Sequence, residues 1–299
     1  MKKTYLADGS LLFVAFIWGS TFVIVQKAIQ FIPPHLFNAT RFLIAALLLL
    51  LFIRKKSRMN IFSLNLFLSG SFLGFFLFLG YAFQTTGLLF TTSSKAGFIT
   101  GLSVMIVPLL SIWLLKDKPR PVIFFSAFIG IIGLYFLTIG DVSGMNIGDL
   151  LVFFCAVAFA LHITLTGKFT KKYNALPLTI VQLGSVSLFS FLSFFLFERH
   201  SFTPSSFINR DVIIALAITS ILATSAAFFI QTKYQQFTTA ARVAMIFAME
   251  PVFAAITAYI VIDEQLSSNG IIGCLFIFLA MIITEIPSIR RIKLIFYNR

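Results

Sequence analysis

Charged residues are scarce in this 299-residue chain, where Asp, Glu, Lys and Arg together make up 11% of the sequence. A typical soluble domain carries about 25%. Hydrophobic residues make up 59%, and the mean hydropathy is +0.99. The scarcity of charge excludes a pair of soluble domains. It predicts a polytopic membrane protein whose main partner is the lipid bilayer.

Acidic residues and cysteines are both few in this chain. The chain has 10 acidic and 23 basic residues, for a net charge of +13. The basic residues lie mostly in short loops and the C-terminal tail, so no domain remains to present a basic patch, and we expect no nucleic-acid partner. Cys155 and Cys274 fall inside apolar runs. We therefore expect no disulfide, no metal site and no cofactor.

Recognisable catalytic motifs are also missing. The chain has no His-Glu-x-x-His, no Gly-x-Gly-Asp and no Gly-x-Ser-x-Gly sequence, so an enzyme is not expected. No small-residue cleavage site follows the first apolar run, Leu11 to Val25. We read that run as an uncleaved first helix rather than a signal peptide.

Long apolar runs dominate what is present, and runs of about 20 residues are long enough to cross a bilayer as helices. Polar breaks at 88–93 and 236–239 separate neighbouring runs, and a single long kinked helix is the alternative at either place. The runs predict ten helices, near 8–29, 35–53, 63–87, 94–115, 121–139, 147–168, 177–197, 211–235, 240–262 and 268–287.

The distribution of Lys and Arg predicts the orientation of these helices. With the N-terminus in the cytoplasm, 18 of the 23 basic residues fall on the cytoplasmic side, including clusters at 54–58, 116–120, 168–172 and 290–299. Cytoplasmic loops of membrane proteins are enriched in such residues. We expect both termini to be cytoplasmic, and the composition hints at a bacterial plasma membrane.

An internal repeat divides the chain in two. The segment from Gln84 to Lys95 matches the segment from Gln231 to Arg242 without gaps, 147 positions later. Five helices per half is an odd number, so the second half is inverted relative to the first. The fold class we expect is an all-α membrane protein with two inverted five-helix repeats, 1–140 and 141–299, around a central cavity. Such repeats are typical of transporters with a substrate site at the seam.

Further along the repeat, the alignment is weaker. Pro108 and Pro251 become equivalent only if four residues are inserted in the first half. On that alignment, the counterpart of Glu250 is the apolar Val107.

Three segments resemble a known family. They read Trp18-Gly19-Ser20-Thr21-Phe22-Val23, Arg41-Phe42-Leu43-Ile44-Ala45-Ala46-Leu47-Leu48 and Met249-Glu250-Pro251-Val252-Phe253-Ala254-Ala255-Ile256. Together they look like the EamA-type branch of the drug/metabolite transporter superfamily. The resemblance implies a cavity between the halves and transport of amino acids or other small metabolites, often outward. Some relatives carry sugar phosphates or nucleotide sugars.

Polar side chains deep in the expected helices are the candidate substrate-binding residues, because a polar group inside a bilayer is costly. Glu250 either binds a substrate amine or a proton, or locks helices together, and Pro251 beside it predicts a kink. His162 is either a proton relay or a buried, hydrogen-bonded neutral histidine, and the resemblance places it at the cavity. The candidates are Trp18, Thr21, Tyr81, Gln84, His162, Gln231 and Glu250.

The remaining candidates of this group come in pairs. Trp18 and Thr21 share one helix face and form either a cavity wall or packing contacts. Tyr81 and Gln84 lie one turn apart. Because Gln84 and Gln231 recur across the repeat, we expect a shared structural role for these two glutamines.

Three cations are candidates for a gate or for substrate charge. Arg41 meets an anionic substrate or snorkels to the interface, and we expect snorkelling. Lys95 and Arg242 begin equivalent helices, where a cation opposes the helix dipole, so each should have a partner. They form gate contacts in alternate states or lie at solvated loop ends.

These features predict a secondary transporter, and most specifically an exporter of amino acids or related amine or zwitterionic compounds. The alternatives are a carrier of anionic metabolites such as sugar phosphates or nucleotide sugars, and a channel. The sequence indicates no oligomeric state.

Overall fold

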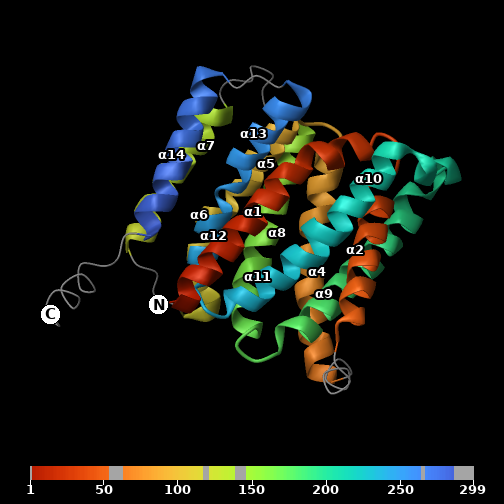
Figure 1. Ribbon diagram of the computed structural model, residues 1–299, viewed down its shortest axis with the longest axis horizontal. Coiled ribbons are helices and arrows are strands. Elements are labelled where there is room, and N and C mark those ends of the chain that lie inside the picture. The colour runs from red at the N-terminus through yellow and green to blue at the C-terminus, as the bar shows by residue number, and fades with distance from the viewer. Residues whose placement is uncertain (1, 54–62, 117–120, 139–145, 264–266, 286–299) are drawn as a thin grey trace, which may run out of the picture.

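The computed structural model describes residues 2–53, 63–116, 121–138, 146–263 and 267–285, and every element in these ranges is helical. The basic clusters at 54–58, 118–120 and 290–299 lie outside the described residues. Figure 1 shows the helices packed as one bundle, with α1 crossing its middle and α7 and α14 side by side at one edge.

The first half runs from α1 to α7. Its fourth expected helix, 94–115, is divided into α5, α6 and a closing π-helical turn, η1. The bounds are α1 Lys2–Ala28, α2 Pro34–Leu51, α4 Leu64–Gly87, α5 Ser93–Gly101, α6 Ser103–Leu110, η1 Ser111–Leu115 and α7 Pro121–Thr138.

The second half runs from α8 to α14, and its expected helix 240–262 is likewise divided, into α12 and α13. Short 3-10 and π-helical turns, η2 to η5, flank or interrupt α9, α10 and α11. The bounds are α8 Ile147–Phe169, α9 Ala175–Ser193, η2 Phe194–Glu198, η3 Arg199–Ser201, η4 Pro204–Ile208, α10 Arg210–Ile218, η5 Thr219–Ala226, α11 Ala227–Gln235, α12 Ala240–Phe247, α13 Glu250–Ile262 and α14 Ser268–Glu285.

All ten expected segments are helical, and eight of them are long and apolar enough to cross a membrane. The other two, α7 and α14, have shorter apolar stretches, Pro121–Gly133 and Ser268–Ala280, in the described residues. The protein is a multi-pass membrane protein. Ten crossings in two inverted halves stay a prediction.

Both expected breaks are present, so the single kinked helix is wrong at each place. Thr92 caps α5 by accepting a hydrogen bond from the Lys95 backbone N–H at 3.2 Å. Thr239 caps α12 by accepting one from Arg242 at the same distance. A threonine side chain in this position satisfies a backbone donor that the helix leaves unpaired. Equivalent caps therefore end both breaks, 147 positions apart.

The same offset continues to the ends of these helices. Lys116 and Asp263 are the two positive-φ residues outside glycine in the described part of the chain, at φ 54° and 52°. Each ends its helix in a left-handed turn, as many helices do. Since the offset is 147 at the start and at the end, no four-residue insertion lies between. The alignment of Pro108 with Pro251 is wrong, and the counterpart of Glu250 is Ser103.

The two equivalent helices begin at opposite ends of α1. Ser93, at the start of α5, donates a hydrogen bond to Gln26 near the end of α1. Arg242, near the start of α12, contacts Asp8 near the beginning of α1. Asp8 and Gln26 are about 27 Å apart along a helix that rises 1.5 Å per residue. The starts of the two equivalent helices therefore lie at opposite ends of α1, which is the arrangement expected if the second half is inverted.

Candidate functional site

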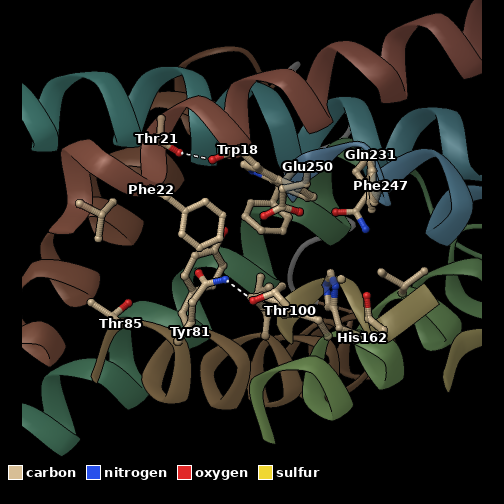
Figure 2. Close-up of a pocket in the computed structure, with 18 of the residues that line it drawn as sticks. Trp18, Thr21, Phe22, Tyr81, Thr85, Thr100, His162, Gln231, Phe247 and Glu250 are labelled. Carbon is tan, nitrogen blue, oxygen red and sulfur yellow. Dashed lines mark hydrogen bonds between the residues drawn. The ribbon is translucent and has the colours of Figure 1, made fainter. Parts of the chain in front are cut away.

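One cavity between the halves collects all seven candidate substrate-binding residues. Its walls come from both halves, and the space open to the centre of a water molecule is about 50 Å³. Figure 2 labels all of these residues except Gln84 around the cavity. The seven are Trp18, Thr21, Tyr81, Gln84, His162, Gln231 and Glu250. That they bind substrate stays a prediction.

Aromatic rings form much of the wall. The Trp18 ring lies 5.1 Å from the Phe228 ring and 5.0 Å from the Phe247 ring, measured between centroids. The Trp18 Nε1–H donates to the backbone oxygen of Ala223 at 2.7 Å. Trp18 therefore lines the cavity and packs between helices at once, so the two interpretations of this residue are not exclusive. Thr21 follows one turn later and donates to the Trp18 carbonyl.

Arg41 lies in the same cavity, and the expectation that it snorkels is wrong. Only 3% of the residue is exposed. Its Nε–H donates to Thr224 Oγ1 at 3.0 Å, and its guanidinium carbon is 4.8 Å from the centroid of the Tyr81 ring. An arginine near a helix end snorkels only when its side chain can reach the interface. Here, the rings of Phe42 and Tyr81 and the η5 residue Thr224 hold it inside the bundle.

The two repeated glutamines differ in their surroundings, so a shared structural role is wrong. The Gln84 Nε2–H donates to Thr100 Oγ1 at 3.2 Å. Gln231 is 1% exposed, and neither its amide nitrogen nor its amide oxygen has a partner. The position equivalent to Thr100 in the second half is Phe247, which offers no acceptor.

Glu250 is the first residue of α13, next to the break at Ala248 and Met249. The expected kink near Pro251 is this break. The carboxylate is partly exposed to the cavity and makes no hydrogen bond or ion pair with another residue in the described part of the chain. A helix-locking partner is therefore absent there. Figure 2 shows the Glu250 carboxylate and the Gln231 amide facing the same space.

His162 is buried and hydrogen-bonded, which matches the second of its two interpretations. Its Nε2 lies 3.0 Å from Gln182 Oε1. The Gln182 Nε2–H donates to Thr232 Oγ1 at 3.1 Å. Because this arrangement makes Oε1 an acceptor, the Nε2 of His162 is the donor. The ring still lines the cavity.

Each of the two cations at the helix starts has a carboxylate partner, so neither is at a solvated loop end. Lys95 Nζ lies 2.8 Å from Asp149 Oδ2, and Arg242 Nη2 lies 2.7 Å from Asp8 Oδ2. Each pair joins the first helix of one half to the fourth helix of the other. The partner required by the helix dipole is thus confirmed at both positions.

Asp8 and Asp149 are the residues that sequence reasoning missed. Asp149 belongs to a capping box in which its carboxylate accepts from the Asn146 backbone, and Asn146 Oδ1 accepts from the Asp149 backbone. It also accepts from Thr91 Oγ1 at 2.7 Å. The sequence did offer one indication. Acidic residues are rare, with 10 in the chain, and the first helix of each half has one near its start.

A metal centre has little to build on. No three His, Cys, Asp or Glu side chains gather within the residues that the structure describes. Cys155 lies behind the wall, with its Sγ 3.8 Å from Thr100 Oγ1.

Comparison with known proteins points to one family. The model of the EamA-like transporter family matches residues 6–139 and again 146–286. An uncharacterized transporter of Archaeoglobus fulgidus is 36% identical over 288 residues, which cover 96% of this chain and 87% of that protein. The uncharacterized transporter YoaV of Bacillus subtilis is 27% identical over 274 residues, 88% of this chain and 91% of its own.

A solved crystal structure shares the fold. It superposes with a TM-score of 0.74 over 97% of this chain and 98% of that chain, at 18% sequence identity. At this identity, the likeness concerns the fold alone.

Proposed function

We propose, on the premise that this chain is a membrane transporter that belongs to the EamA-like transporter family, that it moves small metabolites by alternating access through the central cavity. The cavity lies between two halves, 1–140 and 141–299, that are inverted copies of one five-helix unit. The main support for the proposal is the cavity wall. All seven candidate side chains line it, some from the first half and the others from the second.

The two ion pairs supply the means of alternation. Lys95–Asp149 lies near the end of α1 and Arg242–Asp8 near its beginning, and each pair spans the two halves. In the proposed cycle, each pair is the gate at its own end of the bundle. Opening one end requires separation of one pair while the other holds. Because the two pairs occupy equivalent positions of the repeat, the two open states are related by the symmetry of the fold.

The solutes we propose are amino acids or related amine and zwitterionic compounds, moved outward across a bacterial plasma membrane with both termini in the cytoplasm. Most of the wall is apolar or neutral, and Glu250 is an acid that faces the cavity. A buried carboxylate attracts a cationic group and repels an anionic one.

Transport of anionic metabolites is the second candidate, and Arg41 is the observation that favours it. Arg41 is the one lysine or arginine among the described residues that line the cavity. A phosphorylated solute carries close to two negative charges at neutral pH. One arginine opposed by Glu250 compensates that charge poorly, so this candidate ranks below the first.

Counterflow in proteoliposomes tests the proposed function. Vesicles with the purified protein are loaded with one unlabelled solute, and entry of the same solute in labelled form is followed. The panel holds amino acids, amines and sugar phosphates. Transient accumulation of an amino acid or an amine supports the proposal, and accumulation of sugar phosphates alone favours the second candidate. Conductance without accumulation indicates a channel.

A further inference from the structure

A basic and an acidic side chain face the same cavity, and neither has an oppositely charged partner among the residues that the structure describes. Arg41 comes from α2 in the first half and Glu250 from α13 in the second. The ion pairs found in the described residues join other side chains, namely His35–Glu198, Lys95–Asp149 and Arg242–Asp8. The protein therefore holds a guanidinium group and a carboxyl group apart across a mostly apolar space.

The cationic side is built to hold its guanidinium in place. Arg41 has five N–H donors, of which the Nε–H is bound to Thr224. The guanidinium carbon lies 5.3 Å from the Phe42 ring and 4.8 Å from the Tyr81 ring. These contacts fix the planar group but supply no negative charge. A carboxylate is the partner that matches the fork of an arginine best.

The anionic side has unused hydrogen-bonding capacity. The carboxylate of Glu250 has no partner among the described residues, and both polar atoms of the buried Gln231 amide are unpartnered. Figure 2 shows the two groups on the same side of the open space. Buried polar groups are nearly always paired, and those left over ask for an explanation. An ammonium group has three donors that a carboxylate and an amide oxygen can accept.

We infer that the cavity binds one molecule carrying both a carboxylate and an ammonium group, the carboxylate on Arg41 and the ammonium on Glu250 and Gln231. This inference rests on the proposed transport function and deepens it. Leaving a single buried charge without its partner is costly, whereas a zwitterion neutralises both charges at once. A monovalent amine or acid would satisfy one side only and leave the other exposed to the apolar wall.

The aromatic rings that line the same cavity define the rest of the ligand. Tyr81 and Phe228 lie 6.0 Å apart, and Phe228 also contacts the Trp18 ring. These faces suit an apolar side chain, and they attract a cation that approaches Glu250 past Trp18. The ligand class is therefore a zwitterion with an apolar body.

Equilibrium binding to the purified full chain tests this inference with matched probes. Phenylalanine carries both charges, 2-phenylethylamine lacks the carboxylate, and 3-phenylpropionate lacks the ammonium group. In 6-aminohexanoate, both charges are present but farther apart, so the pair of zwitterions distinguishes an α-amino acid from a longer spacing. We expect at least one zwitterion to bind at least about tenfold more tightly than either single-charge probe, because a site with unpaired polar groups rejects ligands that lack the partner.

Two variants assign the ends of the ligand. In Arg41→Gln, the advantage of phenylalanine over 2-phenylethylamine should disappear, and in Glu250→Gln its advantage over 3-phenylpropionate should disappear. If 6-aminohexanoate is the zwitterion that binds, it is compared with hexylamine and hexanoate instead. Arg210→Gln and Asp211→Asn are the matched controls, since they remove a cation and an acid that are exposed at the start of α10. Both should leave all affinities unchanged.

Some results would overturn the inference, and one would contradict the proposed transport function instead. Equal loss of all probes in each variant would mean that Arg41 and Glu250 act on the shape of the cavity alone. Unchanged zwitterion affinity in Glu250→Gln, with loss only of pH-dependent transport, would make Glu250 a proton site. Zwitterion binding without counterflow would leave the inference standing and contradict transport. Counterflow of neutral or single-charge solutes only would support transport and overturn the zwitterion inference.

Discussion

The two halves of the protein place different side chains at equivalent positions around the cavity. Ser103 begins α6 and Glu250 begins α13, and both line the cavity. Thr100 pairs with Gln84, whereas Phe247 leaves Gln231 without a partner. The caps at Thr92 and Thr239, by contrast, have the same geometry. The framework is thus duplicated, and the groups that face a ligand are not.

Arg41 belongs to the unequal set as well. Asn38 donates to Thr85 at 3.0 Å, and Gln182 donates to Thr232 at 3.1 Å, so these two bonds are equivalent between the halves. Three residues beyond Asn38 lies Arg41. Three residues beyond Gln182 lies Ser185, which carries no charge. Because the helix framework is repeated, the protein can open to either side of the membrane by equivalent movements of the two halves. Because the side chains of the cavity wall are not repeated, the ligand keeps one orientation in both states.

The ion pairs at the two ends should differ in strength, which gives the largest expected effect. The side chain of Asp149 is 1% exposed and that of Asp8 is 16% exposed. Removing the partner of a buried charge costs about 3–5 kcal/mol, and the cost falls with exposure. Lys95→Gln should lower the thermal unfolding temperature clearly more than Arg242→Gln. Adding Asp149→Asn to Lys95→Gln should restore only part of the loss, because the amide keeps one of the two oxygens that accept from Asn146 and Thr91. Equal effects at both ends would refute this ranking.

A substitution at Gly19 shifts the backbone of Glu250 and leaves its carboxyl group in the chain. A methyl group at Gly19 would overlap the carbonyl oxygen of Glu250 and approach the Cβ of Phe253 to 2.7 Å. Overpacking of this kind costs about 1–3 kcal/mol. We expect Gly19→Ala to slow counterflow by about tenfold, because α13 must move away from α1. Gly9→Ala is the control on the same helix, since nothing lies within 4 Å of its new methyl group.

Phe247→Thr gives Gln231 the same neighbour that Gln84 has in the first half, a threonine at the position equivalent to Thr100. The new hydroxyl should accept a hydrogen bond from Gln231, as Thr100 does from Gln84. A hydrogen bond is worth about 0.5–1.5 kcal/mol net, so an occupied Gln231 should weaken ligand binding by about two- to tenfold. The affinity for phenylalanine or 6-aminohexanoate is the readout. Tighter binding in this variant would show that Gln231 does not contact the ligand.

The two helix caps should behave alike and affect stability alone. Thr92→Ala and Thr239→Ala each remove one capping hydrogen bond of 3.2 Å. The loss of a threonine cap costs about 1 kcal/mol. Thermal unfolding should show two small, similar decreases, and the preference among the ligand probes should stay as in the unaltered protein. A change of preference in one variant alone would mean that this cap also shapes the cavity.

The repeat and most helix positions were readable from the sequence because both leave local signals. Apolar runs predicted all ten helical segments, and the gapless match from Gln84 to Lys95 predicted equivalent breaks. The seven polar candidates were found because polar groups are rare inside apolar helices. The division of 94–115 was missed because Leu102 has ordinary helix propensity, whereas Pro251 predicted a kink in 240–262 where α12 and α13 separate.

Tertiary partners were not readable in the same way. Arg41 is followed by an apolar run that suits either a buried or a snorkelling side chain, and only the packing of Phe42 and Tyr81 against it decides. Asp8 is 234 positions from Arg242, so no local pattern links the two. The counterpart of Glu250 was misassigned because two prolines were aligned in place of the helix boundaries.

Solvent access to the cavity is the most direct test of alternation between the two ends. A single reporter cysteine, Ser103→Cys, is placed in the cavity wall of a chain with Cys155→Ala and Cys274→Ala. A membrane-impermeant thiol reagent is then applied from either side of the vesicle. One variant neutralises Lys95 and Asp149 together, and the other neutralises Arg242 and Asp8. The account predicts labelling from one side only in the first variant and from the opposite side only in the second; labelling from the same side in both would contradict it.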